Sequence, residues 1–272
     1  MNAILRGLTA GAILGAASLV GAGVAGADNT AAESAYDRGD YGRALQLWVP
    51  AARGGDAGAQ YNIATIYRLG RGRPADPVVA YQWYRRAAEQ GHLRAQVNLG
   101  RLLLDGSGVK RDAVKAASWF ERAAEADYAP GLYFLGRLHE LGRGVSGDDH
   151  KAAQYYRRAA EQDLTDAAYA LARLYRDGRG VARDRAEAIE WYARAAFDGH
   201  TEAQFAIGRL YDRGDTVDPD PAQAYFWFAM AARAGHDEAR DSRDRLAAIL
   251  SPEQLETARQ LARQWRRGLE QR

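Results

Sequence analysis

The residues best suited to covalent chemistry are Ser107 and Lys110, which lie three positions apart in Ser107-Gly108-Val109-Lys110. Penicillin-interacting enzymes carry a serine and a lysine at this spacing, with the serine at the start of a helix and with partner motifs completing the site. Here the pair falls in a glycine-containing turn, and neither Ser-Asp-Asn nor Lys-Thr-Gly occurs in the chain. We therefore predict no catalytic residue and keep an enzyme as the alternative.

Histidine and cysteine are the other residues that could support chemistry. The chain has no cysteine, which excludes thiolate catalysis, disulfides and cysteine–zinc sites. His92, His200 and His236 each follow a glycine at one position of a repeated pattern, so they lie too far apart to share a metal ion. His139 replaces a core residue, and His150 lies near a predicted helix start. Without a His-x-x-x-His pair or a similar cluster, we expect neither a metal nor a cofactor.

A row of arginines is the strongest candidate for binding. They recur every 36 residues on the predicted solvent side of a helix: Arg101, Arg137, Arg173 and Arg209. Guanidinium groups bind carboxylates bidentately, so such a row suits an acidic segment. Asn62 and Asn98, three residues earlier in their repeats, can bond a peptide backbone, and Phe134 replaces them in the next repeat as an aromatic anchor. The alternative is an ordinary solvated helix face, because arginine is a good helix former.

A repeat of 36 residues positions these side chains. Ala-Ala pairs recur at this step, beginning at Ala51, Ala87, Ala123, Ala159, Ala195 and Ala231. An acidic residue keeps the same step at Asp76, Asp112, Asp148, Asp184 and Asp220. Five full units without an insertion predict a solenoid, in which each unit buries its apolar face against its neighbours.

Each unit is predicted to contain two helices. In the first helix, Ile63 and Tyr67 lie one helical turn apart and belong to a core-facing stripe. Gly70 can adopt the left-handed conformation that ends a helix. Asp76 then offers a side-chain oxygen to cap the second helix, on which Trp83 begins an aromatic pair.

The fourth unit shows the full pattern, with Ala170-Leu171-Ala172-Arg173-Leu174-Tyr175, Gly178-Arg179-Gly180-Val181 and Trp191-Tyr192-Ala193-Arg194-Ala195-Ala196. These residues resemble the Sel1-like repeat family, a relative of tetratricopeptide repeats. The resemblance implies an all-α fold, an α-α superhelix (solenoid) of five repeats with helical caps. It also implies an adaptor or scaffold role and a groove lined by the first helices. Some similar proteins are associated with penicillin-related activity, which is why the enzyme alternative stays open.

The chain is predicted to have four parts. Residues 1–27 have the layout of a secretory signal peptide, with an apolar stretch before Ala25-Gly26-Ala27 and cleavage after Ala27. Residues 28–56 form an N-terminal capping hairpin, 57–236 the five repeats, and 237–272 the C-terminal capping helices. The alternative for residues 1–27 is a membrane anchor that is not cleaved. We expect a periplasmic or secreted location without membrane insertion after signal removal.

The hydrophobic content and the net charge of the chain indicate which class of partner it binds. The chain has 272 residues, of which 47% are hydrophobic, so it can bury a large core. Its net charge is only +2, which argues against nucleic-acid binding, since such proteins concentrate basic residues on one face. The sequence predicts an exported, monomeric scaffold, adaptor or regulator that binds a protein or peptide. A cell-wall or β-lactam-acting enzyme and a glycan or envelope assembly factor are the alternatives.

Overall fold

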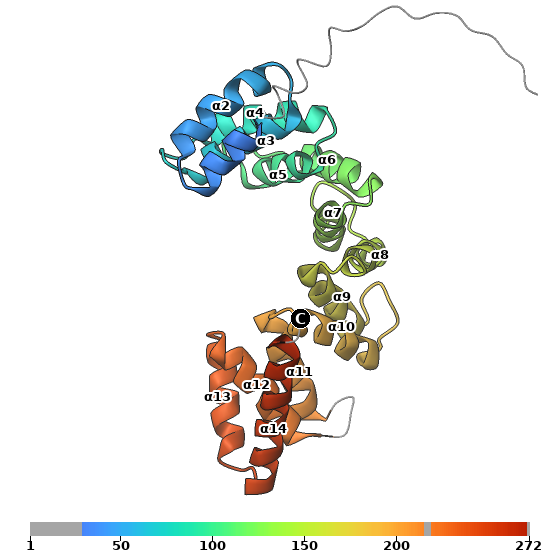
Figure 1. The fold of residues 1–272 in the computed structure, drawn as a ribbon. Coiled ribbons are helices and arrows are strands. Elements are labelled where there is room, and N and C mark those ends of the chain that lie inside the picture. Colours follow the sequence, from blue (N-terminus) through green and yellow to red (C-terminus); the bar gives the residue numbers. More distant parts are fainter. Residues whose placement is uncertain (1–28, 215–218, 271–272) are drawn as a thin grey trace, which may run out of the picture. The chain divides into compact units, whose positions relative to one another are not determined.

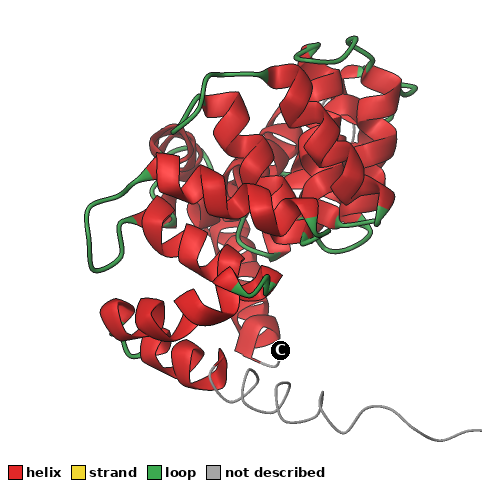
Figure 2. Cartoon of the chain, turned by 90° about the horizontal axis from the view of Figure 1, so that it is seen from above, coloured by secondary structure: helices red, strands yellow, loops and turns green. Residues whose placement is uncertain are grey.

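The computed structural model describes residues 29–214 and 219–270, and the regular structure within these ranges is helical (Figures 1 and 2). A first helix covers residues 29–37. It is followed by α2 (Tyr41–Arg53), α3 (Ala57–Leu69), α4 (Pro77–Glu89), α5 (Leu93–Asp105), α6 (Ala113–Glu125), α7 (Ala129–Leu141), α8 (Asp149–Ala160), α9 (Thr165–Asp177), α10 (Arg185–Phe197), α11 (Thr201–Arg213), α12 (Pro221–Arg233), α13 (Asp237–Ala247) and α14 (Pro252–Glu270). Consecutive helices pack together, as in α7 with α8 and α9 with α10, which confirms the all-α solenoid. The predicted signal peptide lies outside the described residues.

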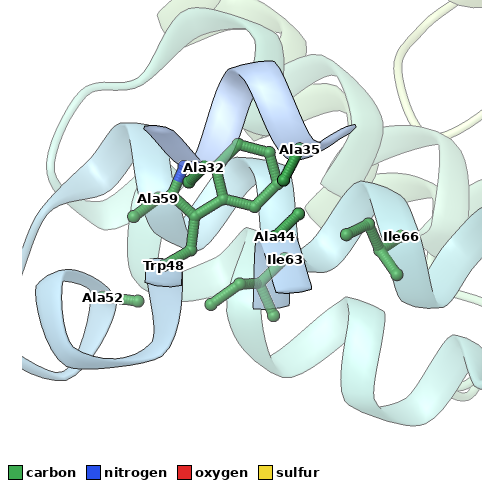
Figure 3. Close-up of a cluster of buried hydrophobic side chains, with 8 residues drawn as sticks. All are labelled: Ala32, Ala35, Ala44, Trp48, Ala52, Ala59, Ile63 and Ile66. Atoms are coloured by element: carbon green, nitrogen blue, oxygen red, sulfur yellow. The ribbon is translucent and has the colours of Figure 1, made fainter. Parts of the chain in front are cut away.

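The described chain forms two compact units. One comprises residues 29–95 with Ser107–Val109, and the other comprises residues 96–106, 110–214 and 219–270. In the first unit the indole of Trp48 is buried among small side chains that include Ala32, Ala35 and Ala59 (Figure 3). Alanines of the first helix, α2 and α3 thus leave the space that the ring of Trp48 occupies.

The ends of the paired helices follow the predicted chemistry. Gly70 ends α3 with a φ of 65°, in the left-handed region, and its N–H donates to the carbonyl of Ile66. The Asp76 carboxylate then accepts the N–H of Val79 at 3.0 Å, which caps α4. The equivalent acidic residues cap four later helices: Asp112, Asp148, Asp184 and Asp220. The predicted helix-ending glycine and the predicted capping aspartates are therefore confirmed.

Glycines on the first helices allow the two helices of a repeat to approach closely. A Cβ atom on Gly100 would lie 2.6 Å from the ring of Phe120, and one on Gly208 would lie 2.6 Å from the ring of Phe228. Both rings are fully buried. Because real Cβ contacts are longer, each ring occupies the space that a side chain at the glycine would need.

The second glycine of the inter-helix turn makes a different contact. A Cβ atom on Gly180 would overlap the main-chain carbonyl group of Asp149, the first residue of α8. Gly144 lies in the same way against Ala113 at the start of α6, and Gly108 lies against Pro77 at the start of α4. Each of these turns therefore packs directly on the main chain of the preceding repeat.

The C-terminal helices pack on the last repeat, where α14 contacts α12. Ser251 and Gln254 form a reciprocal cap at the start of α14, because the Ser251 N–H donates to Gln254 Oε1 at 2.9 Å and the Gln254 N–H to Ser251 Oγ at 3.2 Å. Near the other end, the half-buried Trp265 stacks on Phe197 with ring centroids 4.3 Å apart. Phe197 stands where three other repeats carry Glu89, Glu125 and Glu161, and Trp265 is the aromatic partner that covers it.

Candidate functional site

The first helices of the second unit line a groove of about 470 Å³. Its lining comes from α5, α7 and the start of α9, and it includes three of the predicted binding residues, Arg101, Phe134 and Arg137. Other charged residues in the lining are Asp105, Arg143 and Asp166, and the apolar ones include Leu104, Leu141 and Leu164. We call this the first groove.

Phe134 forms the centre of this group. Its half-buried ring stacks on that of Phe120, with centroids 5.1 Å apart and planes 14° from parallel. The guanidinium carbons of Arg101 and Arg137 lie 5.6 and 5.9 Å from its centroid. At these distances the ring face attracts both cations. Two arginines thus flank one aromatic ring whose position is fixed from behind by Phe120.

Arg101 and Arg137 are exposed, and within residues 29–214 and 219–270 neither forms an ion pair with a carboxylate. Arg137 lies beside Tyr133, with its guanidinium carbon 5.7 Å from the ring centroid. Burial raises the pKa of the Tyr133 hydroxyl, and the neighbouring Arg137 opposes the shift. The hydroxyl therefore stays protonated and neutral, so the cation of Arg137 is not compensated by a phenolate.

Arg173 has a different environment from the other arginines of the row. Its Nη2 lies 3.7 Å from Glu140 Oε1, on a carboxylate whose side chain is only 10% exposed. The same oxygen accepts from Nη1 of Arg179 at 3.0 Å, and Tyr156 donates its hydroxyl hydrogen to Oε2 at 2.8 Å. Arg173 therefore belongs to a charge network between helices. The predicted row is not chemically uniform.

Arg209 lines a second groove, of about 410 Å³, between α9, the start of α10, and α11. Four further arginines contribute to it: Arg176, Arg183, Arg185 and Arg213. These four arginines are not among the predicted binding residues, because none of them occupies the repeated helical position and two lie in or next to an inter-helix turn. For three of them, the density of arginines between Arg173 and Arg185 was the available signal.

Asn62 and Asn98 are half-buried residues of α3 and α5, and neither lines either groove. Asn62 belongs to the first compact unit and Asn98 to the second. Their proposed contact with a peptide backbone therefore gains no geometric support from these two grooves.

The three histidines of the shared repeat position are helix caps. Nδ1 of His92, His200 and His236 accepts the backbone N–H three residues later, at 3.1 to 3.2 Å. Each ring also packs on an aromatic ring of an earlier first helix, as His200 does on Tyr169 at 4.4 Å. Burial lowers the pKa of His92 and His200. Within the part of the chain that the structure describes, no group of three or more His, Cys, Asp or Glu residues could hold a metal ion.

Ser107 lies in the turn after α5 and not at a helix start. That turn is held against the start of α4 by the contact between Gly108 and Pro77. A nucleophilic serine of the penicillin-interacting type sits at a helix N-terminus with its lysine one turn on. The local geometry around Ser107 therefore lacks the arrangement that this chemistry requires.

Comparison with known proteins identifies the repeat. A model of the Sel1 repeat matches residues 34–56, 57–92, 93–128, 129–164, 165–200 and 201–236. The chain belongs to the Sel1 repeat family. The five complete Sel1 repeats coincide with the units of 36 residues, and the shorter first match falls within the segment predicted as an N-terminal hairpin.

Solved structures of Sel1 repeat proteins show the same fold. A Sel1 repeat protein from Oxalobacter formigenes is 29% identical, with a TM-score of 0.75 over 86% of this chain and 98% of its own. A protective antigen of uropathogenic Escherichia coli strains is 25% identical, with a TM-score of 0.56 over 90% of this chain and 62% of its own. An immunity protein from Pseudomonas aeruginosa, at 21% identity, has a TM-score of 0.51 over 74% of this chain and 81% of its own, which shows the fold alone.

No curated protein matches this sequence. Among the described helices, none is long and apolar enough to cross a membrane.

Proposed function

We propose that this Sel1 repeat protein is an exported, non-catalytic scaffold or adaptor that binds a protein partner in the first groove. The observation that carries the proposal is the position of Phe134, held from behind by Phe120 and flanked by Arg101 and Arg137. A few residues supply most of the binding energy at protein interfaces, and these are enriched in aromatic and arginine side chains in pockets that exclude water.

The chemistry of the first groove favours a polypeptide. Its apolar residues suit a partner side chain such as Leu or Phe, and Arg101 and Arg137 suit a carboxylate next to that side chain. Asp105 and Asp166 also line the groove. A uniformly charged polymer such as a nucleic acid would meet these acidic residues, whereas a polypeptide can place a basic or neutral residue opposite them.

Export is the second part of the proposal and rests on residues 1–27. We infer that the segment directs the chain to a periplasm or to the medium, that cleavage follows Ala27, and that the mature protein works as a monomer. Intact mass spectrometry of the protein from its native cells tests the cleavage. A mature chain that begins at Asp28 is expected, and a chain that retains residues 1–27 would contradict cleavage and favour the membrane anchor.

Site-specific photo-crosslinking tests the groove. A photo-reactive phenylalanine replaces Leu141, which lines the first groove and is 54% exposed. The matched position is Val114, which is 67% exposed and does not line the groove. In native cells, we expect one reproducible partner at position 141 and not at 114.

A charge variant links this capture to the arginines. Arg101→Gln with Arg137→Gln should reduce the crosslink at position 141 by about tenfold or more, since interface arginines contribute roughly 2 kcal/mol each when buried by a partner. Arg53→Gln with Arg233→Gln removes the same charge from two exposed helix ends and should leave the crosslink unchanged. Equal capture at positions 141 and 114, or no effect of the groove variant, would rule out the first groove as the docking surface.

A further inference from the structure

The second groove has a strong excess of positive charge. Five arginines line it, against two acidic residues, Asp177 and Glu202. Its remaining residues include Tyr169, Phe205 and Leu210. A concave surface lined by one sign of charge concentrates the electrostatic potential and attracts ligands of the opposite sign.

Both acidic residues already have cationic or titratable neighbours. Asp177 accepts two hydrogen bonds from Arg176, at 2.7 and 2.8 Å, and these bonds lower the pKa of its carboxyl group. Glu202 Oε2 lies 3.4 Å from Nε2 of His236. Of the five arginines that line the groove, only Arg176 is therefore neutralised by one of its two acidic residues.

The other four arginines have no such compensation. Arg183 donates from Nε to the main-chain carbonyl of Arg176 at 3.2 Å, a bond that leaves its charge in place. Within the described ranges, Arg185, Arg209 and Arg213 form no ion pair with a carboxylate. Arg209 lies over Phe205, with its guanidinium carbon 5.8 Å from the ring centroid.

Arg185 is also placed where a cation destabilises its own helix. It is the first residue of α10, directly after the cap Asp184. The N-terminus of a helix carries a partial positive charge, so a cation there is unfavourable and an anion is favourable. A bound carboxylate in the second groove would reverse this unfavourable interaction.

We propose that the second groove is a separate binding site for an acidic peptide segment, whose Asp or Glu side chains pair with Arg185, Arg209 and Arg213. A peptide fits better than a polyphosphate because Phe205 and Leu210 alternate with the charges, and because Glu202 would repel a continuous anion. The chain as a whole, with a net charge of +2, offers no long basic stripe for a nucleic acid.

The site adjoins the first groove through α9. Leu164 and Asp166 at the start of this helix line the first groove, while Tyr169 and Arg176 line the second. The inference rests on the proposed function in one respect, namely that the partner is a polypeptide. The second groove uses different arginines from the first, so an experiment can contradict the inference without contradicting the proposed function, and the reverse.

Fluorescence anisotropy with the purified full chain tests the inference. The probe is a short fluorescein-labelled poly-glutamate peptide, and a labelled poly-lysine peptide of equal length is the negative probe. We expect saturable binding of the glutamate peptide that weakens as salt rises, because carboxylate–guanidinium contacts are screened by ions. Arg209→Gln with Arg213→Gln should weaken binding about tenfold or more.

Two controls separate binding from folding. Arg53→Gln with Arg233→Gln removes the same net charge, and Arg233, like Arg213, lies in the last turn of its helix. This pair should bind as the native chain does. Arg185→Gln should weaken binding several-fold while leaving the melting temperature unchanged or higher, since it removes a cation from a helix N-terminus.

Three results would overturn the inference. They are no binding of the glutamate peptide at low salt, equal binding by the Arg209/Arg213 variant, and displacement of the peptide by tripolyphosphate or single-stranded DNA at lower concentration than by unlabelled poly-glutamate. The crosslink from position 141 is measured in the Arg209/Arg213 variant as well. If it persists while peptide binding is lost, the two grooves act as separate sites.

Discussion

Tyr156 of α8 donates its hydroxyl hydrogen to Glu140 of α7 at 2.8 Å, and both side chains are largely buried. Burial is the main cause that raises the pKa of Tyr156, and the charge of Glu140 adds to it. Arg173 and Arg179 approach the same carboxylate from later elements. One acidic side chain thus joins two consecutive repeats of the second unit.

Replacing this carboxylate should destabilise the protein more than replacing its exposed partner. Glu140→Gln retains an acceptor for Tyr156 but removes the charge that Arg173 and Arg179 face, and a hydrogen bond to a charged group contributes about 1.5 to 3 kcal/mol. Arg173→Gln should cost less than about 1 kcal/mol, because Arg173 is 39% exposed and lies 3.7 Å away. Urea unfolding of both variants measures the difference. Equal costs would show that the network does not depend on Glu140.

The turn glycines should differ in their tolerance of a side chain. Gly180 and Gly199 both have positive φ, of 67° and 85°, but a Cβ atom would overlap the main chain of Asp149 only at Gly180. Gly199→Ala should cost about 1 to 2 kcal/mol from backbone strain alone. Gly180→Ala should cost roughly 2 to 5 kcal/mol, because overpacking adds to that strain. Chemical denaturation of the two variants compares them, and similar losses would contradict the close contact.

The histidine caps should be replaceable by other capping residues. His200→Ala removes the acceptor for the N–H of Ala203 at 3.1 Å, which should cost about 1 kcal/mol. His200→Asn keeps a capping acceptor but loses the ring that stacks on Tyr169. We therefore expect a melting temperature between those of the native protein and the alanine variant. If the melting temperature of His200→Asn is equal to or lower than that of His200→Ala, the stacking contributes more to stability than the capping hydrogen bond.

Stability should fall as mildly acidic pH is approached. The pKa values of His92 and His200 are lowered in the folded protein, chiefly by burial, whereas an unfolded imidazole titrates near its ordinary value of about 6.5. The unfolded state therefore takes up protons first, so this part of the stability is complete above that value and is lost as pH falls below it. Melting temperatures measured between about pH 8 and pH 5 show the effect. The double variant His92→Asn, His200→Asn should depend less on pH over this window, and an unchanged profile would assign the loss to other groups.

Ser107 should not react as a nucleophile. A fluorescent penicillin incubated with the purified protein is expected to label neither the native chain nor Ser107→Ala. Labelling of the native chain that disappears in Ser107→Ala would establish the enzyme alternative. It would also show that a serine in the turn after α5 can react as a nucleophile without lying at a helix N-terminus. A known penicillin-binding protein in the same reaction confirms that the reagent is active.

The sequence was sufficient for the features that depend on local chemistry. Gly70 ends a helix and Asp76 caps the next because each acts on main-chain groups a few residues away, so their repetition could be interpreted directly. The proximity of Arg137 and Phe134 could be predicted for the same reason, since they lie one turn apart on α7. Periodicity also placed Arg209 on the surface of its helix.

Features that depend on departures from the repeat could not be predicted. Arg173 is neutralised in part by Glu140, at a position where the neighbouring repeats carry Leu104 and Arg176. The second groove likewise depends on Arg183 and Arg185, which lie in or next to the turn between α9 and α10 and line the groove together with residues of α9 and α11. Such pairings join residues of different repeats, and an averaged repeat does not contain them.

The contact of each turn glycine with the preceding helix has an evolutionary consequence. Because Gly108, Gly144 and Gly180 pack on main-chain atoms, these contacts between repeats use no side chain of the groove-lining helices. Mutations at exposed groove positions such as 137 or 209 leave these turn contacts unchanged, whereas Phe134 also packs on Phe120 of the preceding repeat. A lineage can exchange one ligand for another through single substitutions while the framework is inherited intact, so relatives with the same backbone should have acquired unrelated partners.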